Sequence, residues 1–258
     1  MREIFPELLV KIWIFVYNES MNTVQRTYVI ESEKIKGEKT FLVLSDLHGT
    51  KVEHFLLEKV KELSPDGIFY VGDMADSIKH QPVTESLMQK LSAYPSYAVF
   101  GNHEYSARLI GRMEHFAKEN GIRYLRGDGV DLGANIALYG LDDRYVGKDF
   151  ERQKRALKGR KEGSFSILLA HRPDDYDFFE EAGFDLVLCG HTHGGQIRIG
   201  AINGLYAPGQ GIFPKYAGGE YQLGKTKMIV GRGLVQNALP RWGNPPEYVT
   251  IHLKGKKV

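Results

Sequence analysis

Polar side chains that can bind metal ions come directly after five apolar runs of this sequence. They are Asp46 with His48, Asp73, Asn102 with His103, His171, and His191 with His193. Imidazole, amide and carboxylate groups, without cysteine, suit first-row transition metals such as Mn, Fe or Zn. Two such ions can hold the attacking and leaving oxygens of a phosphate ester and generate hydroxide near neutral pH. The residue types therefore predict a two-metal site for phosphate-ester hydrolysis, with one carboxylate shared.

Each of these residues, taken singly, has an ordinary structural explanation. Asp46 can cap a turn, and His171 can be a hydrogen-bonded polar group in a loop. Turn chemistry does not call for histidine, however, and it does not explain five clusters that all follow apolar runs. The metal site is therefore favoured by the set rather than by any one member.

The stretch from Cys189 to Gly195 holds two of the histidines, His191 and His193. It lies between an apolar run at 185–189 and an alternating run at 196–200, and both runs predict strands. Side chains alternate along an extended chain, so an extended backbone here would point the two histidines the same way. Alone, the pattern also fits two surface histidines in a glycine-rich turn.

The elements that must position these clusters alternate between strands and helices. Buried strands are predicted at 41–45, 68–71, 97–100, 165–170 and 185–189, and helices at about 50–63, 82–93, 105–119, 151–158 and 174–181, the first of them opened by a capping box at Thr50 and Glu53. Such alternation predicts an α/β sheet, and ligand sites in open α/β sheets lie beyond the carboxyl ends of the strands. Two strands within 130–139, with further strands at 227–230 and 248–253, indicate a β-rich end and a second sheet.

Composition and charge give little support for nucleic-acid binding and none for a disulfide-bonded fold. The 258 residues carry a net charge of +2, too little for a dedicated nucleic-acid binder with a clustered basic face. The one strongly basic stretch, 152–161, is interpreted as a solvated helix face. A single cysteine, Cys189, excludes an internal disulfide, and its apolar neighbours predict that it is buried.

The N-terminal segment, residues 1–40, is expected to pack on a domain that covers 41–258. Its apolar run at 8–17 contains Lys11 and has about half of the roughly 20 residues that a membrane span needs. We expect a strand or short helix there, and an edge strand at 26–36. The expected location is cytoplasmic, with peripheral contact to the inner membrane face as the alternative.

The ordered series of motifs resembles that of the calcineurin-like metallophosphoesterases. The series comprises Asp46-Leu-His48, Gly72-Asp73, Gly101-Asn-His-Glu104, His171 and Gly190-His-Thr-His193. It spans residues 41–200, and no motif of the family is missing. The resemblance implies a two-sheet β-sandwich flanked by helices, with metals at the strand ends. The residue pattern alone predicts only the α/β class with a β-rich end.

A second resemblance concerns the segments Gly194-Gly-Gln-Ile-Arg and Gly231-Arg-Gly233. They resemble a bacterial and archaeal branch of membrane-associated phosphodiesterases that includes proteins similar to UDP-2,3-diacylglucosamine hydrolases. Members of that branch often carry an N-terminal membrane segment. In this sequence, the short run 8–17 is the counterpart of that segment.

The family resemblance implies a role for each site residue. Asp46, His48 and His193 would hold one metal, Asn102, His171 and His191 the other, and Asp73 would bridge both. His103 would not be a ligand; it would protonate the leaving oxygen or stabilise developing charge. Asp76 would hydrogen-bond His103, fix its tautomer and favour the imidazolium.

The implied function is hydrolysis of a phosphate ester by a metal-bridging hydroxide, with a phosphodiester favoured as substrate. The substrate would be a small molecule or a lipid-linked phosphoester. A metal-dependent nuclease is one alternative, but it would need a basic groove. A non-catalytic scaffold is another, since a fold alone does not imply a function. A scaffold would tolerate loss of His103 or of metal ligands, and none is lost here.

Overall fold

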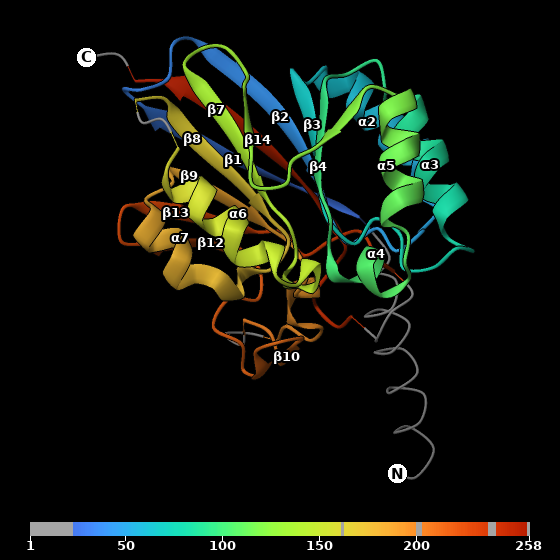
Figure 1. The fold of residues 1–258 in the computed structure, drawn as a ribbon. Coiled ribbons are helices and arrows are strands. Elements are labelled where there is room, and N and C mark those ends of the chain that lie inside the picture. The colour runs from blue at the N-terminus through green and yellow to red at the C-terminus, as the bar shows by residue number, and fades with distance from the viewer. Residues whose placement is uncertain (1–22, 161–162, 200–202, 237–240, 257–258) are drawn as a thin grey trace.

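Two six-stranded mixed β-sheets pack face to face, and helices cover the outer face of each (Figure 1). The computed structural model describes residues 23–160, 163–199, 203–236 and 241–256. The first sheet has the order β1 (Val24–Ser32), β14 (Glu247–Gly255), β2 (Glu38–Leu44), β3 (Gly67–Val71), β4 (Ser96–Val99), β5 (Ile122–Tyr124). The second has the order β12 (Gly219–Leu223), β13 (Thr226–Val230), β9 (Leu186–Cys189), β8 (Phe165–Ala170), β7 (Ile136–Leu141), β6 (Gly129–Asp131). The expected two-sheet sandwich flanked by helices is therefore confirmed.

The helices form the two outer layers. They are α2 (Glu53–Leu63), α3 (Gln81–Lys90), α4 (Asn102–Ser106), α5 (Ile110–Glu119), α6 (Asp149–Lys158) and α7 (Tyr176–Ala182). In Figure 1, α2, α3 and α5 lie beside the first sheet, and α6 and α7 lie beside the second. Short 3₁₀ turns, η1 (Arg144–Val146), η2 (Pro173–Asp175) and η3 (His193–Gly195), and a small hairpin, β10 (Tyr206–Ala207) with β11 (Gly211–Ile212), complete the described elements.

Alternating side chains along the central strands explain the four layers. In β3, Ile68 and Tyr70 pack under the helices, while Phe69 and Val71 face the other sheet. In β8, Ile167 and Leu169 face the first sheet, and their neighbours in the strand pack under α6 and α7. A strand covered on both faces has no polar side, which is why such strands are continuous apolar runs in the sequence.

Parallel pairing brings the carboxyl ends of the central strands of each sheet to one edge. Strands β2, β3 and β4 are mutually parallel, and so are β7, β8 and β9. Because the two sheets stack, loops from both reach the same region, beside α4 in Figure 1. The residues singled out in the sequence lie on these loops.

Three local predictions were wrong. The Thr50 capping box does not form: α2 begins at Glu53, and no side chain caps it. The predicted helix at 105–119 is two helices, α4 and α5, separated at Arg108, whose φ is +57°. No strand forms at 196–199, where a single bridge joins Ile197 to Trp242. In each case the backbone conformation depends on contacts with the site or the core, and not on the local sequence pattern alone.

Strand β1 extends the first sheet at its edge, as an edge strand in this region was expected to do. It pairs in parallel with β14 along its whole length, from Val24 to Ser32. The run at 8–17 lies outside the described residues. Within the described part of the chain, no helix combines the length and the apolar character that crossing a bilayer requires.

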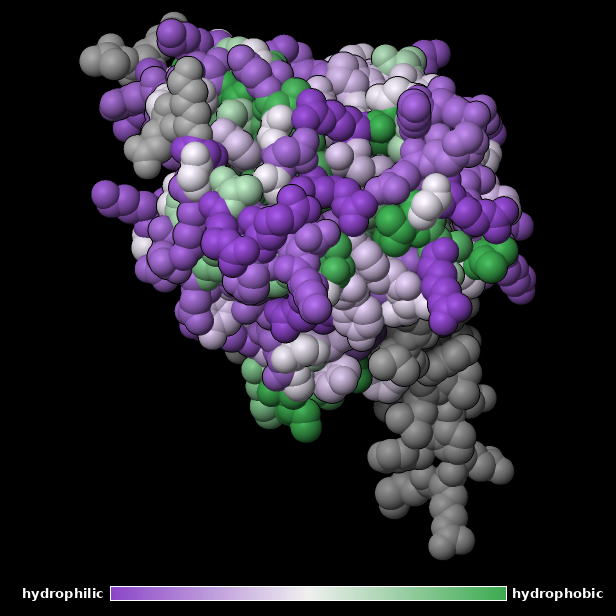
Figure 2. All heavy atoms as spheres, in the orientation of Figure 1, coloured by the Kyte–Doolittle hydropathy of each residue, from purple (hydrophilic) through white to green (hydrophobic). Residues whose placement is uncertain are grey.

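The hairpin β10–β11 carries exposed apolar side chains at the end opposite its turn. Ile212 and Phe213 are 70% and 67% exposed, and Phe213 has a φ of +54°, an outlier for a bulky residue. Hydrophobic residues gather at the lower edge of Figure 2, where the hairpin lies in Figure 1, whereas most of this face is hydrophilic. The hairpin lies next to the loop that carries His191 and His193, because Leu205 N donates a hydrogen bond of 2.9 Å to Gly195 O.

Candidate metal centre

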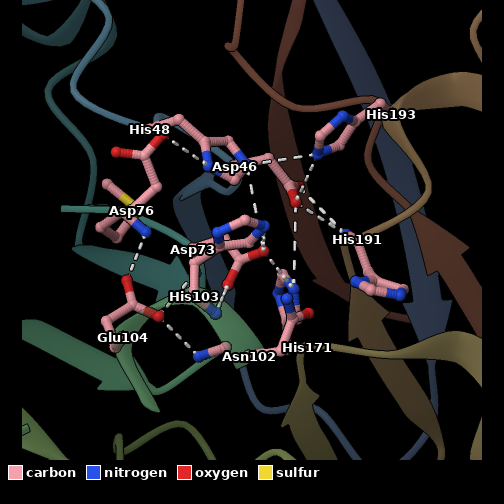
Figure 3. A network of polar contacts seen from close by, with 12 residues as sticks. Asp46, His48, Asp73, Asp76, Asn102, His103, Glu104, His171, His191 and His193 are labelled. Atoms are coloured by element: carbon pink, nitrogen blue, oxygen red, sulfur yellow. Dashed lines mark hydrogen bonds and ion pairs between the residues drawn. The ribbon is translucent and has the colours of Figure 1, made fainter. Parts of the chain in front are cut away.

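Loops after five strands supply the side chains of one buried cluster (Figure 3). Asp46 and His48 follow β2, Asp73 and Asp76 follow β3, and Asn102, His103 and Glu104 begin α4 after β4; His171 follows β8, and His191 and His193 follow β9. The structure thus brings together every residue that the motifs singled out. The first sheet contributes seven of these residues and the second sheet three, so the site exists only when both sheets are packed.

Asp73 lies at the centre of the cluster. Its Oδ1 accepts a hydrogen bond of 2.8 Å from the backbone N–H of His103. Its Oδ2 is 3.0 Å from His171 Nε2 and 3.9 Å from His48 Nε2. One oxygen is therefore held by the backbone, while the other faces histidines from both sheets, as a bridging ligand requires.

A first group with metal-ligand spacing consists of Asp46, His48 and His193. Asp46 Oδ1 is 3.4 Å from His193 Nε2, and Nε2 of His48 is 3.3 Å from that same nitrogen. Both carboxylate oxygens of Asp46 accept from the backbone N–H of His191, at 2.9 and 3.1 Å. All three side chains are buried, so their donor atoms face one another rather than water.

A second such group consists of Asp73, His171 and His191. Nδ1 of His171 donates to the carbonyl oxygen of Val71 at 2.8 Å, which leaves Nε2 as the nitrogen that faces the cluster. That nitrogen is buried and forms an ion pair of 3.0 Å with Asp73 Oδ2, while Oδ1 of Asn102 is buried without a hydrogen-bond partner among the described residues. A backbone carbonyl that fixes the tautomer of a ligand histidine is typical of metal sites.

Backbone strain concentrates at the ligands. Five of them have φ between +47° and +71°, namely Asp46, His48, Asp73, His191 and His193. Such conformations cost about 1–3 kcal/mol each for residues other than glycine and cluster at functional sites. They also correct the expectation of an extended backbone through His191 and His193, which instead lie on a tight turn that ends in η3. The neighbouring Gly190 must lack a side chain, since a Cβ there would lie 2.4 Å from Asp46 Oδ2.

Glu104 holds the two loops of the first sheet together. Its carboxylate accepts backbone hydrogen bonds from Gly101, Asp73, Met74 and Ala75, at 2.6–3.1 Å. Burial, and then the charge of Asp73, raise the pKa of Glu104 to about 7. Glu104 belongs to one of the sequence motifs, but the family resemblance implied no role for it. Its position three residues after Gly101, at the start of a helix, is the signal that could have indicated one.

His103 lies at the open side of the cluster, with a side chain 43% exposed. Its Nε2 is 3.9 Å from Asp73 Oδ2, and its ring meets that of His48 edge to face. Burial lowers the pKa of His103 below its ordinary value, although Asp73 opposes the shift. His103 is therefore accessible to a substrate in a way that the buried histidines are not.

Asp76 does not hydrogen-bond His103, contrary to the expectation. Its Oδ1 contacts His80 Nδ1 at 2.6 Å, and its Oδ2 lies 3.7 Å from His48 Nδ1. His80 is four residues further along the chain and occupies the carboxylate from the start of α3. The neighbouring imidazole of His48, and then the hydrogen bond with His80, lower the pKa of Asp76 although burial opposes them. Asp76 thus orients the ring of a metal-ligand candidate.

The buried charges require a cation. Burial alone would raise the pKa of Asp46 and of Asp73, but the neighbouring histidines lower both below the ordinary value. Burial would lower the pKa of His171, but Asp73 and Asp46 raise it to about 10. The carboxylates of Asp73 and Asp46 therefore favour a positive charge at this position. Together with the orphaned Asn102 oxygen and the mixed oxygen and nitrogen donors, this fits transition-metal ions.

Arg172, which belongs to none of the predicted site motifs, contacts the cluster through His191. Its Nη1 is 2.8 Å from Nε2 of His191, and its Nε is 2.5 Å from Oδ2 of Asp143. Burial, then the charges of His171 and Arg172, lower the pKa of His191 to about 2, so this ring is neutral. The signal in the sequence was a cationic residue directly after a strand-terminal histidine.

Comparison with protein families identifies the class to which this fold and site belong. A model of the calcineurin-like phosphoesterases matches residues 39–195. A metallophosphoesterase of Campylobacter jejuni is 31% identical over 100% of this chain and 71% of its own. One of Aquifex aeolicus is 31% identical over 89% of this chain and 91% of its own. The chain belongs to the calcineurin-like phosphoesterases and is a hydrolase.

More distant relatives agree with this class. The phosphodiesterase YaeI of Escherichia coli is 27% identical over 67% of this chain and 64% of its own. Among solved structures, TT1561 of Thermus thermophilus is similar with a TM-score of 0.53 and 13% identity, over 76% of this chain and 89% of that one. The phosphopantetheinyl hydrolase of Mycobacterium tuberculosis has a TM-score of 0.52 and 9% identity, over 77% and 89%. These structures share the fold.

Proposed function

We propose that this chain is a phosphodiesterase that uses two transition-metal ions, of Mn, Fe or Zn. Asp46, His48 and His193 would hold one ion, Asn102, His171 and His191 the other, and Asp73 both. The observation that carries the proposal is the position of Asp73 Oδ2 between His171 and His48. Two bound ions would withdraw charge from the phosphate oxygens and lower the pKa of water enough to supply a nucleophile.

The protein's own residues would determine how the ester approaches and which group donates a proton to the leaving oxygen. The ligand histidines and aspartates are buried, whereas the side chain of His103 is 43% exposed, so an ester would approach from the side of His103. Nε2 of His103 would protonate the leaving oxygen. Burial disfavours the imidazolium there, but the negative charge of a bound phosphate raises the pKa of a neighbouring imidazole. Substrate binding would therefore restore the proton that the acid needs.

A small or lipid-linked phosphodiester is the proposed substrate class. The name of the Escherichia coli relative supports a diester, and the low net charge of the chain argues against a nucleic acid. The proposed location is cytoplasmic or peripheral to the inner membrane face, because residues 8–17 are too few to span a bilayer.

Metal analysis combined with a substrate panel tests the proposal. The purified protein should bind about two transition-metal ions per chain, and a strong chelator should abolish turnover. Bis-nitrophenyl phosphate should be hydrolysed faster than nitrophenyl phosphate, and single-stranded DNA should not be cut. Asp73→Asn should lose metal and turnover, whereas Asp149→Asn, at an exposed carboxylate on α6, should lose neither. Full activity of metal-free Asp73→Asn would contradict the two-metal mechanism.

A further inference from the structure

Arg172 is held in place beside the metal centre by a buried carboxylate. Its side chain is 12% exposed and that of Asp143 is 0% exposed, and the two are joined at 2.5 Å. The other oxygen of Asp143 accepts from the backbone N–H of Tyr145 at 3.0 Å. The guanidinium is therefore anchored through Nε, and its two terminal nitrogens are directed elsewhere.

One terminal nitrogen of Arg172 depends on a lone pair of His191. Nη1 lies 2.8 Å from His191 Nε2, and because a guanidinium can only donate, that ring nitrogen must accept. The other terminal nitrogen, Nη2, makes no hydrogen bond within the described residues. Arg172 thus donates to the imidazole of His191, which is also a ligand in the proposed metal centre.

Metal loading removes this acceptor, whichever nitrogen of His191 becomes the ligand. If Nε2 binds the ion, its lone pair is no longer available to Arg172. If Nδ1 binds the ion, the ring proton must sit on Nε2, which then becomes a donor. Arg172 is left beside the centre with its Nη1 donor unpaired and Nε still fixed by Asp143. The Nη1 donor would then need another acceptor, and the oxygens of a phosphate are suitable ones.

We propose that Arg172 donates hydrogen bonds to a non-bridging oxygen of the substrate phosphate in the metal-loaded enzyme. The inference rests on the proposed phosphoesterase function of the same site. Planar guanidinium donors match the geometry of phosphate oxygens. Since Asp143 balances the charge of Arg172, the pair contributes directed N–H groups more than net positive charge. Arg172 would therefore orient the phosphate between the metals and His103.

The competing explanation is that Arg172 only neutralises the buried Asp143. The two explanations predict different affinities for inorganic phosphate when Arg172 is replaced in the folded, metal-loaded protein. Arg172→Met alone would strand a buried carboxylate, so the informative variant is Arg172→Met combined with Asp143→Asn. Arg172→Lys keeps the charge without the planar fork. Arg144→Met is the control of equal charge change, because Arg144 is 45% exposed and pairs with Asp175 rather than with the cluster.

The test is calorimetric titration of the metal-loaded variants with inorganic phosphate, together with metal analysis. Arg172→Met/Asp143→Asn should keep its metals and bind phosphate about 10- to 100-fold more weakly, the usual loss for hydrogen bonds to a charged group. Arg172→Lys should fall between that variant and the parent, and Arg144→Met should match the parent. The value of kcat/KM should follow the phosphate affinity.

Unchanged phosphate affinity in the double variant would overturn the inference, and so would loss of metal, since Arg172 would then act only by supporting His191. These outcomes are distinct from failure of the proposed function. A parent enzyme that hydrolyses no phosphoester, but whose phosphate affinity still depends on Arg172, would refute the function and support the phosphate site. A metal-loaded parent that binds no phosphate would overturn both.

Discussion

Among the histidines of the cluster, His103 is the one that the structure leaves accessible to a substrate. We expect His103→Ala to keep both metals and to lose turnover about 10²–10⁴-fold, the usual contribution of general acid catalysis. The loss should be smallest for esters with a good leaving group such as nitrophenol, which needs little protonation. Metal analysis and turnover measured on the same preparations test this expectation.

His171→Ala is the matched comparison for His103→Ala. Its Nε2 is buried and faces Asp73, so this variant should lose occupancy of one metal together with activity. If His103→Ala empties a metal site, or hydrolyses a poor leaving group as fast as the parent, His103 is not the acid.

Asp76 is expected to act on the metal through His48, not on His103. Asp76→Asn removes the carboxylate that lies 3.7 Å from His48 Nδ1. Carboxylates that orient a ligand histidine typically contribute 10- to 100-fold in metal affinity, so we expect a loss of about that size. Metal titration of the apo-protein measures it. An unchanged metal affinity with a shifted pH profile of turnover would instead favour the role beside His103 that the family resemblance implied.

At this scale, the sequence indicated which residues meet but not all of their contacts. Asp46, Asp73 and His171 follow buried strands directly, so their place at the sheet edge follows from topology. The partner of Asp76 depends on how the chain turns into α3 and brings His80 alongside, and local pattern does not determine that path. The contacts of Arg172 could not be predicted for the same reason, since Asp143 and His191 are distant from it in the chain.

At the scale of elements, Glu104 connects the start of α4 to the loop after β3. Glu104→Gln would replace one accepting oxygen with an NH₂ group that faces backbone N–H donors. We expect a loss of roughly 3 kcal/mol in the free energy of unfolding, the lower part of the range for breaking a buried charged network. Urea unfolding of the metal-free protein, at a pH above the value of about 7 at which Glu104 ionises, measures this loss.

Glu119→Gln is the control, because this side chain at the end of α5 is 63% exposed. It should unfold like the parent. Equal stability of the Glu104 and Glu119 variants would mean that the four backbone hydrogen bonds to Glu104 contribute little to holding the loops.

The predicted elements succeeded where both faces of a strand are covered. β3 and β8 are short, continuous apolar runs, and burial of both faces requires such runs. Prediction failed where a polar or glycine-rich segment is shaped by distant contacts. Residues 196–199 alternate like a strand, but Asn244 donates to the carbonyl oxygens of His193 and Gln196 and holds the segment in a turn. The packing of two sheets was implied by the family resemblance and not by residue pattern.

At the scale of the whole molecule, association with membranes is expected to be weak. The apolar run at 8–17 is interrupted by Lys11 and has about half of the roughly 20 residues that a membrane span needs. After lysis without detergent, the intact chain should be found in the supernatant or be released from the membrane pellet by high salt. A chain that only detergent releases would contradict this expectation.

Thiol modification of Cys189 measures how often β9 separates from its neighbours in the second sheet. It is the only cysteine in the chain and is 2% exposed, and burial raises the pKa of its thiol well above the ordinary value. A reagent can therefore reach a thiolate only when β9 separates from its neighbours, and β9 also carries the loop of His191 and His193. Ions that bind only the closed form slow such openings in proportion to their occupancy. We expect metal loading to slow the labelling of Cys189, and chelation to restore its rate. Equal rates in both states would mean that β9 opens without disturbing the two histidines. If metal loading does slow the labelling, the thiol reports on metal occupancy of an intact chain without any substrate being known.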